Sequence, residues 1–329
     1  MNWIGIVAVI AAILLLVFVS ACAYAGHFFI NAFLVKDSTW YHDHGHQMMN
    51  PDNFDRPKNI YTETEDRQNE ESHKFWDENA AGDLQLKLDG ETLVAREFKG
   101  QPGDHRWVLC VHGYRSTGKR DMSYPAMKFA RAGYNVVVPD LRAHGKSTGE
   151  VIGMGWLEKE DVKAWANKIV ELDPAAKIIL FGGSMGAASV MMASGDPLPK
   201  QVKMLIADCG YSSVYNECRY LLKSALHLPT GPILFFANSF CRKKMGFELK
   251  TASSINQLHK NHLPALFIHG TEDKFVPHTA IYKNMEATQG RKMGLLINKA
   301  PHLSSWIYDE KRYFTVVEQF IANNLESGN

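Results

Sequence analysis

The sequence contains 329 residues, of which 46% are hydrophobic and 22% are charged, and its formal net charge is +1. This length and composition are typical of one large globular α/β domain with additional segments, and they exclude a disordered chain. The near-zero net charge gives no indication of a polyanionic partner, so we expect no nucleic-acid binding. The five cysteines include no C-x-x-C pair, so no zinc or redox site is expected; Cys218 and Cys241 are expected as free thiols, with a disulfide between them left open.

An apolar stretch at the N-terminus predicts a membrane-spanning helix. No charged residue occurs between residues 3 and 35, and about 20 apolar residues are enough to cross a bilayer. Residues 19–22 and 23–25 resemble signal cleavage sites, but the apolar character continues beyond both. The stretch has no polar face, which argues against a helix buried in a soluble core. We therefore expect an uncleaved single-pass anchor over residues 1–36 in the cell membrane.

The side of the membrane on which the following domain lies stays open. Lys36, Arg56, Lys58 and Arg67 follow the span, and no Lys or Arg precedes it. The positive-inside rule then favours a domain on the inside. Acidic residues are interspersed and only Lys36 is close to the span, and many single N-terminal anchors place an enzyme outside.

Residues 37–80 are polar and predict a linker followed by a packing arm. A short helix is expected to end near Trp76, whose ring would hold the arm against the domain. His42, His44 and His46 alternate, which raises the question of a metal site. Because a segment rich in Asn and Asp does not fix ligand geometry, we expect a solvated linker and no metal.

From residue 81 onward, strand and helix patterns alternate. Two alternating segments around an Asp-Gly turn predict a β-hairpin, and six apolar segments separated by helical spacing predict a parallel sheet. The expected strands cover residues 84–88, 92–98, 107–111, 134–139, 178–181, 202–207, 265–268 and 294–297, and the expected helices cover residues 121–132, 156–172, 187–193, 279–288 and 309–324. Residues 212–262 interrupt the alternation and predict a helical cap between two parts of one core, 81–211 and 263–329.

The segment Gly182-Gly-Ser-Met-Gly186 fits the pattern G-x-S-x-G and stands between a predicted strand and a predicted helix. In this context the motif places the Ser184 hydroxyl on a sharp turn above the end of the strand. The first amides of the following helix then point to the space where an oxyanion would form. A glycine-rich turn that only permits close packing is the alternative explanation, and the flanking strand and helix make it the weaker one.

Several motifs together resemble the α/β-hydrolase fold from about residue 84 to residue 325. The chain is similar to the bacterial membrane-anchored serine hydrolases of the serine-aminopeptidase-like (S33) group. The motifs that carry this resemblance are His112-Gly-Tyr, Asp140-Leu-Arg-Ala-His-Gly, Gly153-Met-Gly-Trp-Leu, Gly182-Gly-Ser-Met-Gly, His269-Gly-Thr-Glu-Asp and Pro301-His302. The resemblance implies a mostly parallel sheet flanked by helices, with the active site at the carboxyl ends of the strands.

The resemblance also implies a catalytic triad in the chain order Ser, Asp, His. Ser184 would be the nucleophile and His302 the base that a weakly acidic hydroxyl needs. Asp273 would orient the imidazole and stabilise its charged form. Glu272 and Asp208 stay open as alternative acids, and Asp208 is the stronger of the two because it ends a predicted strand.

Two other histidines compete with His302 for the role of base. His269 ends a predicted strand, where packing is the commoner role, and His278 lies close to the predicted acid in sequence. For the oxyanion hole we expect two backbone amides, those of Met185 and Tyr114.

Asp140, Arg142 and His144 also look catalytic as a motif. The resemblance implies a structural role for them, in which an Arg–Asp pair orders the loop.

These features predict a membrane-anchored serine hydrolase that acts on a small-molecule ester with a moderately apolar acyl group, through an acyl-enzyme. The apolar residues of the cap that suggest this substrate are Leu221, Leu222, Leu226, Ile233, Leu234, Phe235 and Phe236. Packing of the cap onto the sheet would explain the same residues. A peptidase or amidase stays an alternative, as does a non-catalytic binding module. No Walker loop or G-x-G-x-x-G motif follows the first strands, so no cofactor is expected, and the sequence does not indicate an oligomeric state.

Overall fold

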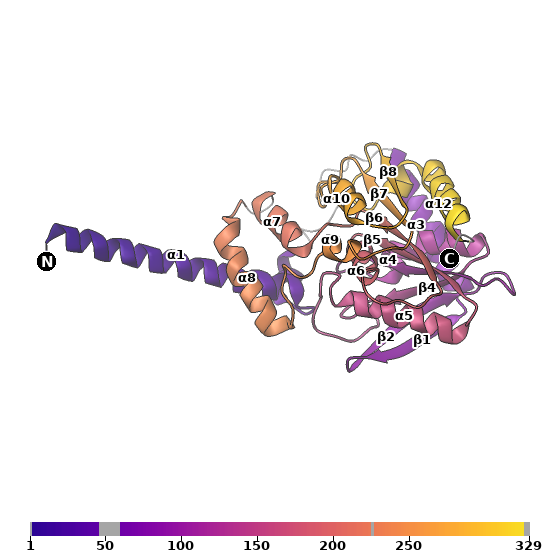
Figure 1. The fold of residues 1–329 in the computed structure, drawn as a ribbon, viewed down its shortest axis with the longest axis horizontal. Helices are drawn as coiled ribbons and strands as arrows, with labels where there is room; N and C mark the ends of the chain where they lie inside the picture. The colour runs from indigo at the N-terminus through magenta and orange to yellow at the C-terminus, as the bar shows by residue number, and fades with distance from the viewer. Residues whose placement is uncertain (1, 46–59, 225–226, 326–329) are drawn as a thin grey trace.

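The computed structural model describes residues 2–45, 60–224 and 227–325. A long N-terminal helix, α1 (Trp3–Leu34), projects from a domain in which helices surround a central sheet (Figure 1). The predicted residues His46, Arg56, Lys58 and Leu226 lie outside the described residues.

Eight strands form one sheet in the order β1-β2-β4-β3-β5-β6-β7-β8. The predicted hairpin is present: β1 (Gly82–Leu88) and β2 (Glu91–Phe98) pair antiparallel, and Asp89 and Gly90 between them both have positive φ. β2 also pairs antiparallel with β4, and every other pairing in the sheet is parallel. The remaining strands are β3 (Arg106–Val111), β4 (Asn135–Asp140), β5 (Lys177–Gly183), β6 (Val202–Asp208), β7 (Ala265–Gly270) and β8 (Lys292–Ile297).

The apolar runs form strands because both faces of the sheet are covered. Along β3, Leu109 packs on one face of the sheet and Cys110 on the other, as side-chain alternation requires. The helices that bury one face are α5 (Glu158–Leu172), α6 (Met185–Ala193) and α10 (Ala280–Ala287), and those on the other face are α4 (Gly118–Arg131), α11 (Ser305–Tyr308) and α12 (Glu310–Leu325).

The polar segment before the domain contains more helix than the sequence predicted. A π-helical turn, η1 (Tyr41–Gly45), leaves His42 and His44 exposed. Helix α3 (Ile60–Asn79) then packs against α4, where the hydroxyls of Ser72 and Ser123 lie 2.9 Å apart. Buried Trp76 contacts the ring of Phe98, so this arm holds onto the sheet as expected.

The cap consists of α7 (Val214–Ser224), α8 (Thr230–Met245) and the short α9 (Ser254–Leu258). Leu222, Ile233 and Leu234 are buried in its packing, whereas Phe235 is 67% exposed. Leu222, Ile233 and Leu234 therefore stabilise the cap, which agrees with the explanation that the apolar residues of the cap serve its packing. All five cysteines, including Cys218 and Cys241, are buried free thiols.

The two parts of helix α1 have different surroundings. Residues 3–21 are nearly all exposed, whereas Phe29, Ile30 and Leu34 are buried in the domain. Helix α8 packs against this second part so closely that a Cβ atom on Gly26 would lie 2.8 Å from the backbone of α8 (Figure 1). Helix α1 therefore packs into the domain before the predicted boundary at residue 36, because an apolar helix without a polar face can pack against protein on any side.

Candidate active site

Ser184 stands at the junction of β5 and α6, on the sharp turn that the motif predicted. Its backbone has φ 56° and ψ −117°, a conformation that costs free energy and is found mainly at functional sites. The Ser184 N–H donates to the carbonyl of Asp208 at 2.9 Å, which fixes the turn to the next strand. A Cβ on Gly186 would collide with the carbonyl of Val111, so only glycine lets α6 approach the end of β3.

The structure brings Ser184, His302 and Asp273 into one hydrogen-bonded chain. His302 Nε2 lies 2.8 Å from Ser184 Oγ, and His302 Nδ1 lies 2.7 Å from Asp273 Oδ2. The other carboxylate oxygen, Asp273 Oδ1, accepts the N–H groups of Phe275 at 2.9 Å and Val276 at 2.8 Å. With Nδ1–H donating to this fixed carboxylate, Nε2 is free to accept the serine proton.

The charges of the site favour an active base. Burial would raise the pKa of Asp273, but the charge of His302 and hydrogen bonds from His269 and His302 outweigh it and hold the pKa well below its usual range. Burial would lower the pKa of His302, but the carboxylates of Asp273 and Asp208 outweigh it and raise the pKa above its usual value. The ionised acid therefore stabilises the imidazolium that forms when His302 takes a proton.

The rival residues do not take part in the hydrogen-bonded chain of Ser184, His302 and Asp273 in the way that the prediction required. Asp208 accepts the Tyr313 hydroxyl at 3.0 Å, and burial raises its pKa to about 6. Glu272 is exposed. His269 is buried, and its Nε2 lies 3.1 Å from Asp273 Oδ2, so it contacts the acid and not the serine. For His278, no hydrogen bond to the triad occurs among the described residues.

A second loop passes beside the nucleophile. A Cβ on Gly113 would lie 3.3 Å from Ser184 Cβ, so the backbone at residues 113–114 borders the serine. Asp121, in the first turn of α4, holds this loop by accepting the Gly113 N–H at 2.9 Å and the Ser116 hydroxyl at 2.5 Å. Met185 begins α6 on the other side of Ser184. The predicted oxyanion donors thus flank the serine, and their catalytic role stays a prediction.

Comparison with known proteins gives the same fold. Residues 106–228 match the family model described as alpha/beta hydrolase fold. The chain superposes on the Pyrococcus furiosus esterase Pf2001 with a TM-score of 0.59 and 22% identity, over 77% of this chain and 94% of that one. This chain has the α/β-hydrolase fold.

Two curated proteins are related in sequence to this α/β-hydrolase-fold chain. It is 27% identical over 225 residues to the uncharacterized protein YqkD of Bacillus subtilis (strain 168), covering 67% of this chain and 72% of that protein. It is 30% identical over 112 residues to a 3-hydroxybutyrate-oligomer hydrolase of Cupriavidus necator, covering 34% of this chain and 37% of that protein. The predicted fold class is confirmed.

The loop that borders the nucleophile is bound to the C-terminal end of α1. The guanidinium of Arg115 donates hydrogen bonds to three carbonyl oxygens there, those of Val35 at 2.6 Å, Lys36 at 2.8 Å and Ala32 at 3.3 Å. Arg115 also stacks on Tyr41, 3.8 Å from the ring centroid. The Tyr114 hydroxyl donates to the Phe33 carbonyl at 2.6 Å. We call these contacts the α1 clamp; they make the apolar helix part of the support of the site.

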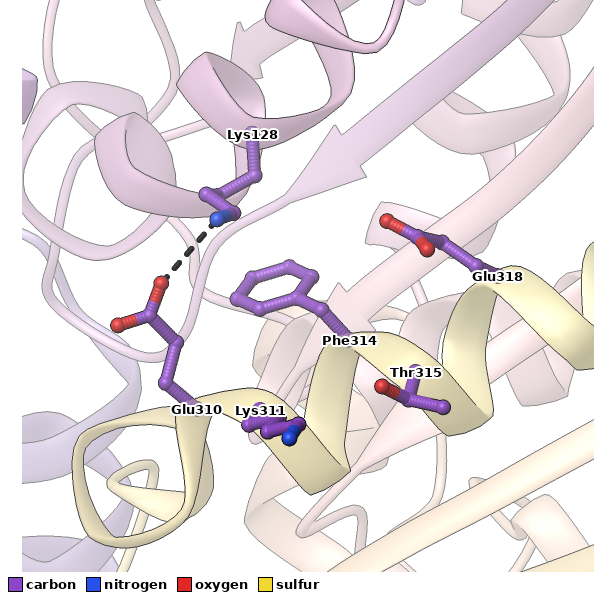
Figure 2. Close-up of a pocket in the computed structure, with 6 residues that line it drawn as sticks. All are labelled: Lys128, Glu310, Lys311, Phe314, Thr315 and Glu318. Atoms are coloured by element: carbon purple, nitrogen blue, oxygen red, sulfur yellow. Dashed lines mark hydrogen bonds and ion pairs between the residues drawn. The ribbon is translucent and has the colours of Figure 1, made fainter.

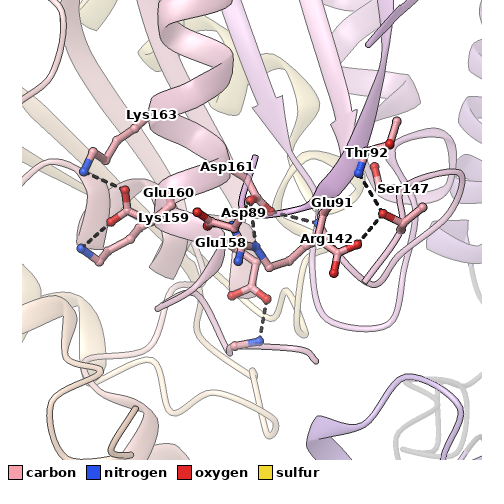
Figure 3. A network of polar contacts seen from close by, with 12 residues as sticks. Asp89, Glu91, Thr92, Arg142, Ser147, Glu158, Lys159, Glu160, Asp161 and Lys163 are labelled. Carbon is pink, nitrogen blue, oxygen red and sulfur yellow. Dashed lines mark hydrogen bonds and ion pairs between the residues drawn. The ribbon is translucent and has the colours of Figure 1, made fainter. Parts of the chain in front are cut away.

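The Asp140, Arg142 and His144 motif supports loops. Arg142 Nε and Nη2 donate to Asp161 Oδ1 at 2.8 and 2.6 Å, so the Arg–Asp pair that orders the loop reaches α5 (Figure 3). Asp140 Oδ1 accepts the N–H at the start of α4 at 2.9 Å. His144 Nε2 accepts the Arg115 N–H at 2.9 Å and thereby steadies the α1 clamp.

The Gly153-Met-Gly motif forms a turn around a buried carboxylate in the same region (Figure 3). Glu158 accepts the N–H groups of Gly153 at 2.6 Å and Gly155 at 2.7 Å. Just before this turn, Ile152 N–H donates to the Leu34 carbonyl at 2.9 Å. The end of α1 is therefore held on two sides, by this turn and by the α1 clamp.

Cys209, Asp273 and His302 offer ligand atoms within 4.8 Å of one another, which is a spacing that a metal ion could use. Burial raises the pKa of the Cys209 thiol well above its usual value, so the thiolate that a metal prefers is disfavoured. The other two side chains already bond to each other. This donor set does not fit a metal and is explained by the triad.

Glu217 of α7 is a buried carboxyl that the sequence did not single out. It is 4% exposed, and its Oε1 has no hydrogen-bond partner among residues 2–45, 60–224 and 227–325. Burial, reinforced by the charge of Asp273, raises its pKa well above the usual value.

A surface hollow lies between α4 and α12 (Figure 2). Lys128 and Glu310 form an ion pair of 3.1 Å at its edge. None of the triad residues lines it, so we assign it no role in the site.

Sequence reasoning missed the supporting residues. His269 was weighed only as a rival base, and Asp121 and Arg115 were not considered. Asp121 follows the His112-Gly-Tyr motif at the start of a predicted helix, which is a usable signal. No signal in the sequence indicates the role of Arg115, because its partners lie about 80 residues away in the chain.

Proposed function

We propose that this chain is a membrane-anchored serine hydrolase that cleaves a carboxylic ester with a moderately apolar acyl group. The observation that carries the proposal is the hydrogen-bonded chain from Ser184 through His302 to Asp273. Its distances are within the range needed for proton transfer from the serine. The esterase Pf2001 shares the fold, and the C. necator relative is named a 3-hydroxybutyrate-oligomer hydrolase. Because 3-hydroxybutyrate units join to each other through ester bonds, both likenesses favour esters.

In the proposed reaction, Ser184 Oγ attacks the ester carbonyl while His302 Nε2 takes its proton. The oxyanion would accept hydrogen bonds from the Met185 and Tyr114 amides. His302 then gives the proton to the departing alcohol, leaving an acyl-enzyme on Ser184. Water, deprotonated by the same imidazole, hydrolyses the acyl-enzyme and restores the serine.

The properties of α1 support the membrane anchor. At about 1.5 Å per residue, exposed residues 3–21 span about 28 Å, close to the thickness of the hydrocarbon core. Exposed Trp3 and Tyr24 bracket this span, as aromatic residues do at both membrane surfaces. Because buried Cys22 and Gly26 belong to the domain packing, cleavage near either residue would remove part of it, which favours an uncleaved helix.

The test is labelling of the full chain in detergent by a fluorophosphonate probe. Wild type, Ser184→Ala and His302→Ala are compared, and only wild type should be labelled. The full chain is needed because removal of residues 1–36 would expose the buried surface under α1 and break the α1 clamp. Absence of labelling in folded wild type would overturn the hydrolase proposal and favour a binding module.

A panel of substrates then separates ester from amide hydrolysis. We expect nitrophenyl esters to be cleaved faster than aminoacyl arylamides, with a preference for intermediate acyl length. Faster cleavage of the arylamides would favour a peptidase or amidase. Equal rates for all acyl lengths would contradict an apolar acyl pocket.

A further inference from the structure

Helix α8 exposes an apolar surface beside α1. Phe235 is 67% exposed, the largest exposed fraction of a large hydrophobic residue outside α1 in the described part of the chain. Leu228, just before the helix, is 41% exposed, and the Phe236 ring contacts that of Phe235. The adjacent rings of Phe235 and Phe236 lie next to the apolar helix α1, and contiguous exposed apolar surface of this kind marks protein or membrane interaction sites.

The contact with α1 fixes the level of α8 relative to a bilayer. If residues 3–21 fill the hydrocarbon core, Gly26 lies about 7 Å beyond its edge, at about 1.5 Å per residue. The headgroup layer extends roughly 5–8 Å beyond the core on each side. Because Gly26 touches the backbone of α8 at Ile233 and Ala237, α8 lies within this layer. Figure 1 shows that α8 runs across α1, so its axis follows the membrane surface.

The exposed side chains of α8 lie outside its contacts with the rest of the protein. Ile233 and Ala237 are buried where α8 touches α1 at Gly26, and Leu234, Cys241 and Met245 are also buried. The domain lies on the side of α8 that is farther from the N-terminus of α1 (Figure 1). Phe235 lies outside this buried set and is 67% exposed, so its ring is free to contact the lipid beside α1.

The C-terminal end of α8 adds positive charge to this surface. Arg242, Lys243 and Lys244 follow one another in the last turn and are all exposed. Lys244 also bonds to Asn31 of α1, which ties the basic end to the anchor. Apolar side chains next to a basic cluster are typical of helices that lie on anionic membrane surfaces.

We propose that α8 is a second membrane contact, an interfacial helix that inserts Phe235 below the headgroups and binds anionic lipid headgroups through residues 242–244. The inference rests on the membrane anchoring proposed above. It makes the cap, and not only α1, part of the membrane surface.

Site-specific probes test this arrangement in the full chain. Because all five native cysteines are buried, a single introduced surface cysteine can be labelled selectively, with unlabelled wild type as the control. An environment-sensitive dye is attached to Phe235→Cys, Leu15→Cys or Tyr282→Cys, and each protein is placed in nanodiscs of phosphatidylcholine and phosphatidylglycerol. Leu15 and Tyr282 are 63% and 56% exposed and report the anchor and the domain surface.

We expect the dye at position 235 to lose quenching by aqueous iodide and to be quenched by nitroxide-bearing lipids, as at position 15 and unlike position 282. Iodide quenching at 235 equal to that at 282, with position 15 in lipid, would overturn the inference and leave the anchor intact. Iodide quenching at position 15 would overturn the anchor itself.

The charge contribution has its own comparison. Lys243→Glu should increase iodide access at position 235 in phosphatidylglycerol nanodiscs and leave it unchanged in pure phosphatidylcholine. Lys311→Glu on α12, also an exposed lysine, is the matched control and should have no effect. Equal iodide access for both variants in phosphatidylglycerol would overturn headgroup binding by the basic cluster.

Discussion

The α1 clamp gives a prediction with a magnitude that can be worked out. Arg115→Ala removes three hydrogen bonds to carbonyl oxygens and the stacking on Tyr41. Hydrogen bonds to a charged group contribute about 1.5–3 kcal/mol each when buried. Arg115, Val35 and Lys36 are partly exposed, so hydrogen bonds to water replace part of this free energy when the side chain is removed. About 1 kcal/mol per bond remains, and the stacking contributes about 0.5–1 kcal/mol.

We therefore expect Arg115→Ala to lower the free energy of unfolding by about 3–4 kcal/mol, measured by denaturant titration of the full chain in detergent. Arg115→Lys should lose about half of this, because one ammonium cannot serve three carbonyls in the same geometry. Both variants keep a non-glycine residue at the positive φ of 49°, so backbone strain is matched.

The same substitution should slow the labelling of Ser184. The loop of Arg115 carries the predicted Tyr114 amide donor, and complete loss of one such donor costs about 10²–10³ in rate. If the loop is displaced, the labelling rate should therefore fall by part of that factor. Arg120→Ala, at an exposed arginine of α4, is the control. Wild-type stability and wild-type labelling in Arg115→Ala would refute the idea that α1 supports the site.

Three further predictions concern buried ionisable groups. Asp273→Asn should lower the esterase rate by about 10⁴ with little loss of folded protein, because the amide favours the wrong tautomer of His302; a residual rate near wild type in folded protein would reassign the acid. The esterase rate should rise with pH through the pKa of His302, and its half-maximal point should lie above the ordinary value of about 6.5, because the neutral imidazole is the active form and nearby carboxylates raise that pKa; a midpoint below this value would contradict the charge arrangement. Glu217 has a raised pKa in the folded state, so folded protein holds the proton more tightly and stability falls as pH rises from its ordinary pKa toward the folded one. Glu217→Gln should therefore be more stable than wild type at pH 8, by about 1.4 kcal/mol for each pKa unit of the shift, and nearly equal at pH 4.5; thermal unfolding at both pH values measures this, and an equal difference at both would exclude the titration of Glu217 as its cause.

The sequence predicted the sheet well because its strands are short apolar runs between glycine-rich or polar turns. The segment 178–181 is buried on both sides and carries no alternation, as a central parallel strand requires. The motif around Ser184 was informative for the same reason, since one local turn determines where the hydroxyl lies. Local patterns of this kind report local geometry.

Contacts between distant segments could not be predicted in this way. The packing of α8 on α1 involves an apolar helix, α1, that has no polar stripe to indicate which of its sides is covered. The bond from Arg115 to Val35 spans 80 residues, and no spacing rule connects them. The assignment of Asp273 over Asp208 depended on which carboxylate reaches His302, which only the packed structure decides.

The absence of a break in α1 has a mechanical consequence. The helix continues from the proposed bilayer into the domain and ends at Leu34, about 20 Å beyond the hydrocarbon edge at about 1.5 Å per residue. If residues 3–21 cross the bilayer, a rigid strut of this kind holds Ser184 at a fixed height above the lipid, in contrast to a flexible tether, which would let the domain approach the lipid. An ester at the hydrocarbon edge must move out of the lipid to reach Ser184. Each CH₂ that leaves the lipid costs about 0.8 kcal/mol. Because a long acyl chain must take more CH₂ groups out of the lipid, the length of the strut favours shorter acyl chains over long ones.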